Sequence, residues 1–173
     1  MNQDYKDLLS AFHAHGVKYL VVGGFAVIFH AQPRFTKDMD VFVKADPANA
    51  QATYAALAAF GAPLQSLRPE DFADRSSFFR FGREPRGFDI LPNIPGVDFD
   101  AAWERRVESV IDPATGLKAN FISADDLIAS KLASGRPQDI ADADAIRKAA
   151  ESQGPNPAKK KPPEPTPGSG PSQ

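Results

Sequence analysis

Two acidic residues flank one apolar residue near the start of a short apolar stretch. Asp38 and Asp40 lie on either side of Met39 in the segment DMDVFV. Because side chains alternate across a strand, both carboxylates project from one face of the strand predicted over residues 39–43. Like charges this close repel and raise each other's pKa unless a cation neutralises them, and hard oxygen ligands suit Mg²⁺ or Mn²⁺. The spacing therefore predicts a divalent-metal site.

A double glycine comes before these acids. Gly23 and Gly24 follow the apolar run over residues 17–22 and precede a segment with helical character, residues 25–31. Glycine lets the backbone approach a phosphate closely, and the free N–H groups at the start of a helix attract anions. Gly23, Gly24 and Phe25 are therefore predicted to bind the β- and γ-phosphates of a nucleoside triphosphate. A Gly-Gly pair alone is more often a plain turn, and the nucleotide interpretation depends on its combination with the acids.

The order of these motifs resembles a known signature. Gly-Gly followed by Asp-hydrophobic-Asp-hydrophobic is similar to the DNA polymerase β-like nucleotidyltransferase superfamily. The segments RFTKDMD and SADDLIASKLASGRPQDIADADAI resemble its small bacterial branch, which includes the abortive-infection nucleotidyltransferase toxins. The resemblance covers residues 17–147. It implies a third carboxylate on a neighbouring strand, and the segment GFDILP supplies Asp89.

The resemblance implies both a fold and a reaction. The fold is an α/β (α+β) core, with helices packed on a mixed sheet and further helices at the C-terminal end. The reaction transfers a nucleoside monophosphate from an NTP to an acceptor hydroxyl on RNA such as tRNA, on a protein or on a small molecule, and releases pyrophosphate. Asp38 and Asp40 would hold the Mg²⁺ that carries the triphosphate. Asp40 and Asp89 would flank a second ion, where the hydroxyl is deprotonated. A toxin–antitoxin partner protein is a further expectation from this branch.

Two basic residues are candidates for nucleotide binding. Arg34 could reach a phosphate or fix Asp38 by a bidentate pair, and a structural ion pair fits the sequence equally well. Lys131 lies among apolar residues of a predicted helix and could direct its ammonium at the triphosphate. From the residues alone, a surface Lys whose stem covers apolar neighbours is the simpler interpretation, and the resemblance favours the nucleotide. Arg136 and the acids that follow it are predicted to anchor the last helix by ion pairs.

Two other classes of function stay open. One is a non-catalytic interaction module, for example an antitoxin-like domain that retains the fold, although all three carboxylates are present. The other is an RNA-binding module, because arginines interleave with phenylalanines around residues 77–91 and could contact phosphates and stack on bases. A solvated hairpin with a buried Phe face explains the same cluster. Its arginines are Arg75, Arg80, Arg83 and Arg86.

Helices and strands must alternate to position these residues. Apolar residues at helical spacing and capping signals predict the helices, and short β-branched or aromatic runs predict the strands. Helices are predicted over residues 3–14, 25–31, 47–60, 98–105, 123–132 and 137–150. Strands are predicted over residues 17–22, 39–43, 77–81, 87–91 and 119–122.

Composition places the chain among globular proteins. Of its 173 residues, 42% are hydrophobic and 24% are charged, so residues 1–150 can form one globular domain. The resemblance implies that this is a nucleotidyltransferase domain. Residues 151–173 are rich in Pro, Lys and Gly and lack apolar periodicity, which predicts a disordered tail.

The same composition bears on location and partners. The absence of Cys excludes thiolate metal sites and agrees with a reducing cytoplasm. The most apolar run, residues 19–29, is too short to span a bilayer, and no apolar leader is visible, so we expect a cytoplasmic protein without membrane contact. A net charge of -2 argues against specific binding of duplex DNA.

Overall fold

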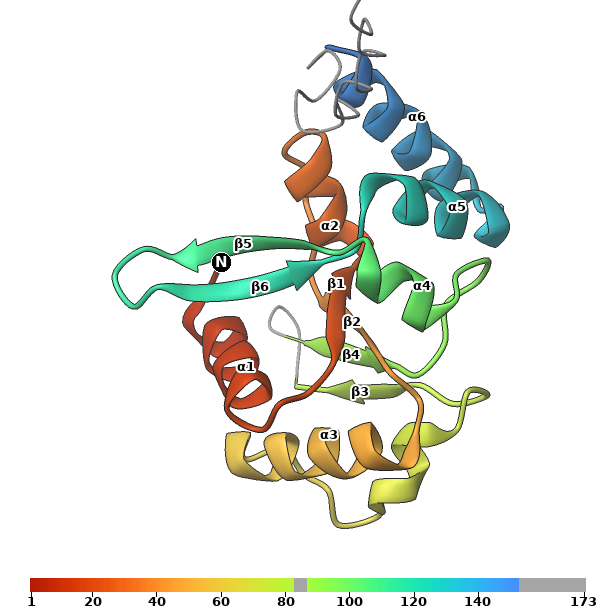
Figure 1. Ribbon diagram of the computed structural model, residues 1–173. Helices are drawn as coiled ribbons and strands as arrows, with labels where there is room; N and C mark the ends of the chain where they lie inside the picture. The colour runs from red at the N-terminus through yellow and green to blue at the C-terminus, as the bar shows by residue number, and fades with distance from the viewer. Residues whose placement is uncertain (83–86, 153–173) are drawn as a thin grey trace, which may run out of the picture.

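A mixed six-stranded sheet forms the centre of the protein (Figure 1). The computed structural model describes residues 1–82 and 87–152. The strand order is β3-β4-β2-β1-β6-β5, which agrees with the predicted mixed sheet. The strands are β1 (Tyr19–Val22), β2 (Met39–Val43), β3 (Phe79–Phe81), β4 (Phe88–Leu91), β5 (Val107–Asp112) and β6 (Leu117–Phe121).

The central strands carry the acids predicted to bind metal. β2 pairs antiparallel with β1 and parallel with β4, while β3 pairs antiparallel with β4. In the parallel pair the register places Asp40 opposite Asp89. Met39, Val41 and Ile90 are completely buried, so the apolar neighbours of these acids form the core beneath them.

Helices surround the sheet in two groups (Figure 1). α1 packs against α3, whereas α5 and α6 pack together and contact α2. None of the helices in the described ranges is long and apolar enough to cross a membrane. The helices are α1 (Gln3–Ala14), α2 (Gly23–His30), α3 (Pro47–Phe60), the 3₁₀ turn η1 (Pro69–Ala73), α4 (Phe99–Glu104), α5 (Ala124–Ser134) and α6 (Pro137–Ser152).

Local capping explains where several helices begin and end. Asp46 caps α3 by accepting from the Asn49 N–H at 2.7 Å, and Pro47 fills the first turn, where no N–H partner is needed. Gly61, with φ of 91°, ends that helix. Ser123 caps α5 by accepting from the Asp126 N–H at 3.2 Å. These signals lie in the sequence, and the predicted range 47–60 is confirmed.

Three parts of the fold differ from the prediction. β5 and η1 were not predicted, because β5 is an edge strand without a fully buried side chain and η1 is a single short turn. α2 begins at Gly23, so the double glycine forms the first residues of the helix and does not precede it.

Some predictions concern residues that the structure does not describe. Arg83, Arg86 and residues 153–173 lie outside the described residues. Residues 151–152, which were predicted to belong to the tail, form the end of α6.

Candidate active site

The three predicted acids come together where β2 and β4 begin. Asp40 and Asp89 are direct partners across the parallel strands, so their side chains lie side by side on one face of the sheet. Asp38 precedes β2, and the Met39 N–H donates to the Gly87 carbonyl at 3.1 Å. Asp89 is buried, with 7% of its surface exposed. The sheet thus fixes the backbone of all three acids.

Two glycines leave the space that the carboxylates occupy. Gly23 has φ of 61°, and a Cβ atom built on it would lie 1.9 Å from Oδ2 of Asp40. A Cβ atom on Gly87 would lie 2.6 Å from Oδ1 of Asp38. Asp40 therefore contacts the backbone at the first turn of α2, so the acids and the predicted phosphate-binding turn share one site.

Gly87 belongs to this site although the sequence did not single it out. Its only sequence signal is its place directly before the apolar strand that carries Asp89. Of the two adjacent glycines, Gly23 has a positive φ and Gly24 does not. A Cβ atom on Gly24 would instead lie 2.5 Å from Oγ1 of Thr36, so this glycine allows close packing of the loop before β2.

Tyr5 ties together the two segments that carry the acids. Its hydroxyl shares its proton between the carbonyls of Lys37, at 3.0 Å, and Gly87, at 3.1 Å. Its ring packs edge-on against Phe25 of α2, with 5.3 Å between the ring centroids. The Phe25 side chain is therefore a packing element, and its predicted contact with phosphate depends on the backbone alone.

Burial and neighbouring negative charge both disfavour the charged form of Asp40. Burial raises the pKa of Asp40 to about 6, and the neighbouring carboxylates of Asp89 and Asp38 add to that rise. Lys131 and Arg80 oppose it by stabilising the charged form. The site therefore favours a cation or a proton close to Asp40.

Lys131 and Arg34 belong to a network of ion pairs centred on the buried acids Asp139 and Asp142. The Lys131 ammonium donates to Asp139 at 2.7 Å and to Asp142 at 2.9 Å. The Arg34 guanidinium pairs with Asp142, not with Asp38, and Arg136 donates to Asp139 at 2.6 Å. The network fixes the loop before β2 to α6, which supports the structural ion pair among the two interpretations of Arg34. Of the ion pairs predicted for Arg136, the one with Asp139 is present, whereas Asp142 pairs with Lys131 and Arg34.

A small pocket adjoins Asp40 and Gly23. It has a volume of about 240 Å³, and its lining includes apolar residues such as Leu127. Lys131 and Arg136 also line it, so Lys131 reaches the site although its ammonium is held by acids of α6. The pocket can accept a group that is partly apolar and partly anionic.

The donor set at the site suits a divalent ion that is shared with a substrate. Neighbouring carboxylates, one of which has a strongly raised pKa, provide the oxygen ligands and the unbalanced charge that Mg²⁺ relieves. Across the residues that the structure describes, no three His, Asp or Glu side chains are arranged to hold an ion by themselves. We infer that phosphate oxygens would complete the coordination, as is usual for Mg²⁺.

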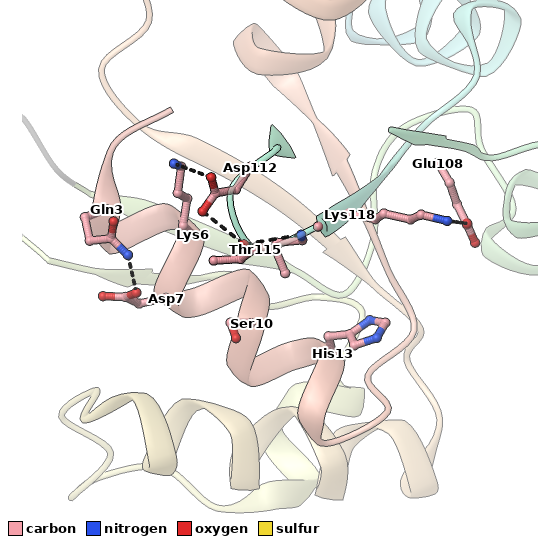
Figure 2. Close-up of a pocket in the computed structure, with 11 residues that line it drawn as sticks. Gln3, Lys6, Asp7, Ser10, His13, Glu108, Asp112, Thr115 and Lys118 are labelled. Atoms are coloured by element: carbon pink, nitrogen blue, oxygen red, sulfur yellow. Dashed lines mark hydrogen bonds and ion pairs between the residues drawn. The ribbon is translucent and has the colours of Figure 1, made fainter. Parts of the chain in front are cut away.

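A larger hollow lies elsewhere, between α1 and the β5–β6 hairpin (Figure 2). Its volume is about 560 Å³, but its charged residues pair with one another. Lys6 lies 3.4 Å from Asp112, and Lys118 lies 3.9 Å from Glu108. None of the predicted site residues lines it, so size alone does not identify the active site.

The raised pKa of Asp40 predicts a dependence of stability on pH. The folded protein holds a proton on Asp40 more tightly than the unfolded chain, so the free energy of unfolding falls as pH rises from about 4 to about 6. The Asp40→Asn variant lacks this loss. We expect the variant to gain up to about 2–3 kcal/mol over the wild type between these limits. Urea unfolding of both proteins across this range measures the gain, and a constant difference would contradict it.

The chain is similar to known proteins both in sequence and in structure. The profile of a family described as a nucleotidyltransferase of unknown function (DUF6036) matches residues 87–149, which include Asp89 and Lys131. The chain is also similar to the crystal structure of the lincosamide antibiotic adenylyltransferase LnuA bound to lincomycin, with a TM-score of 0.53 and 18% sequence identity. That match covers 87% of this chain and 98% of the other. A search of curated proteins finds no match.

Proposed function

This chain has the fold of the polymerase β-like nucleotidyltransferases, as its sequence predicts, and on that premise we propose that it transfers a nucleoside monophosphate from an NTP to an acceptor hydroxyl. The observation that supports this function most directly is the position of Asp40. Its carboxylate lies beside Asp89 and directly against the backbone of Gly23 at the start of α2. Metal ligands and phosphate-binding backbone would thus meet at one point.

Different residues of the chain would bind the phosphates and the metal. The N–H groups at the start of α2, at Gly23, Gly24 and Phe25, would hold the β- and γ-phosphates. Asp38, Asp40 and Asp89 would hold Mg²⁺ or Mn²⁺, which supplies neutralisation of charge on the phosphates and lowers the pKa of the acceptor hydroxyl. Most of the acceleration would then come from positioning and charge, as in phosphoryl transfer generally.

Lys131 and Arg136 would contribute from the pocket beside Asp40. Both side chains line it together with apolar residues, so the pocket suits part of a nucleotide or of a small acceptor molecule. Lys131 is already paired with Asp139 and Asp142. It would therefore attract the nucleotide by its positive charge from a fixed position, and it would not move to form a direct contact with the phosphates.

The acceptor is proposed to be a small molecule in the first instance. One solved structure with a similar fold is named as a lincosamide antibiotic adenylyltransferase, and lincosamide antibiotics are small molecules. Transfer to tRNA or to a protein is tested in the same assay, by incubating α-labelled NTPs with each acceptor class. A toxin–antitoxin partner protein, expected from the sequence resemblance, would enter that assay as a candidate acceptor or inhibitor.

Binding of metal and nucleotide together is the first measurable consequence. We expect wild-type protein to gain thermal stability when Mg²⁺ and an NTP are both added, by an amount that grows with ligand concentration. Either ligand alone should have less effect, because the triphosphate and the carboxylates repel without a cation between them. Thermal melting with each of the four common NTPs tests this. No Mg²⁺-dependent response to any of them at millimolar concentration would favour the non-catalytic interaction module.

A further inference from the structure

Arg80 holds the third carboxylate of the site. It lies on β3 directly opposite Asp89 in the antiparallel register. Its Nε donates to one oxygen of Asp89 at 2.8 Å, and its Nη2 donates to the other at 2.7 Å. This bidentate arrangement engages both carboxylate oxygens. Asp89 is therefore already neutralised by a cation that belongs to the protein.

The two partners differ greatly in their freedom to move. The Asp89 side chain is 9% exposed and is fixed between β2 and β3, whereas the Arg80 side chain is 62% exposed. An exposed arginine can turn away from the site without disturbing the core. Asp89 cannot follow it, since its backbone is paired on both sides.

The net charge of the three acids also supports a role for Arg80 in metal binding. When ionised, Asp38, Asp40 and Asp89 carry three negative charges, and Arg80 offsets one of them, so a single divalent ion would complete the balance. A second divalent ion beside Asp89 would be repelled by the guanidinium. The triphosphate brings anionic oxygens that an arginine binds as readily as it binds a carboxylate.

We propose that Arg80 is an internal counter-cation that withholds Asp89 from metal until the nucleotide arrives. In the nucleotide-free protein, Arg80 occupies Asp89 and the divalent ion is held by Asp38 and Asp40. When a triphosphate enters, its oxygens draw the guanidinium away, and Asp89 becomes available as a ligand. Arg80 is thus a positioning residue that makes completion of the metal site depend on substrate. The inference rests on the proposed nucleotidyl transfer, which supplies the triphosphate.

The test is the affinity of nucleotide-free protein for Mn²⁺, measured by calorimetry and by the electron paramagnetic resonance signal of the free ion. We expect Arg80→Gln to bind Mn²⁺ at least about tenfold more tightly than the wild type, because the competing charge is gone. Arg80→Lys keeps the charge and should stay close to the wild type. The gain should vanish in the Arg80→Gln, Asp89→Asn double variant, since Asp89 is the ligand that is released.

A matched control comes from a similar pair away from the site. Arg105 donates to Asp126 at 3.0 and 2.6 Å, with side-chain exposures of 53% and 11%. Arg105→Gln should leave Mn²⁺ affinity unchanged, so an equal gain there would indicate a nonspecific charge effect and overturn the inference. Unchanged or weakened Mn²⁺ binding by folded Arg80→Gln would also overturn it. Failure of the proposed function would be seen separately, as absence of labelled transfer by wild-type protein with every acceptor class.

Discussion

The Asp40→Asn variant is expected to lose nucleotidyl transfer by a factor on the order of 10³ or more while it keeps its fold. Asp40 lies between Asp38 and Asp89 and contacts the start of α2, so it is the ligand that every metal arrangement at this site would share. Losing a carboxylate that binds metal removes several kcal/mol of transition-state stabilisation. The same change should raise the melting temperature of the nucleotide-free protein at neutral pH, since it removes the cost of burying a charged carboxylate and relieves repulsion from Asp89 and Asp38.

Labelled-NTP transfer and thermal melting on the same samples measure both effects. Asp144→Asn is a suitable control, because Asp144 is exposed and pairs only loosely with Arg147, at 3.4 Å. It should change neither quantity appreciably. Transfer by Asp40→Asn at the wild-type rate would rule out the metal assignment. A collapse of the fold in this variant would show that Asp40 is needed for stability and not for chemistry alone.

Replacing Gly23 with alanine is expected to abolish transfer as completely as the loss of Asp40. The added Cβ atom would lie 1.9 Å from Oδ2 of Asp40, and also 2.7 Å from its Cγ and 2.9 Å from its Cβ. Rotation of the carboxylate cannot relieve the last of these contacts, so β2 or α2 must shift. The left-handed φ of 61° adds about 1–2 kcal/mol of strain for a residue that is not glycine.

Gly16 separates the steric effect from the backbone strain. It has nearly the same φ, 64°, but a Cβ atom on it would meet nothing within 4 Å. Gly16→Ala should therefore lose stability by the strain alone and keep full transfer activity. The difference between the two variants in urea unfolding measures the displacement of Asp40. Equal stability losses together with retained transfer in Gly23→Ala would contradict the close approach of α2 to the acid.

Local signals made much of the scaffold predictable. α1, β2 and α3 have the predicted bounds, because the apolar period, Gly-bearing ends and an N-terminal proline all act within a few residues. The two central acids share a face for the same reason, since alternation along a strand needs no knowledge of the partner strand. β5 carried no such signal. As an edge strand of the sheet it has few buried side chains, and its pairing with β6 depends on tertiary context.

The ion-pair partners of Arg34 and Arg80 could not be predicted from the sequence. Arg34 pairs with Asp142 of α6, 108 positions along the chain, and no local pattern selects that acid over its neighbours. Arg80 was visible only as a member of an Arg/Phe cluster. Its pairing with Asp89 follows from the register of β3 against β4, which two flanking apolar runs do not determine by themselves.

The strand order also determines when the acid cluster can form as the chain folds. β2 meets β4 only after α3, η1 and β3 have been made, and β1 meets β6 still later, through the pairing of Val21 with Phe121. Contacts between such distant segments form slowly, because closing the intervening loops costs entropy before the contacts stabilise the fold. A nascent chain that ends after β2 carries Asp38 and Asp40 without their third partner. We therefore expect transfer activity to begin only after β4 has been synthesised and has paired with β2.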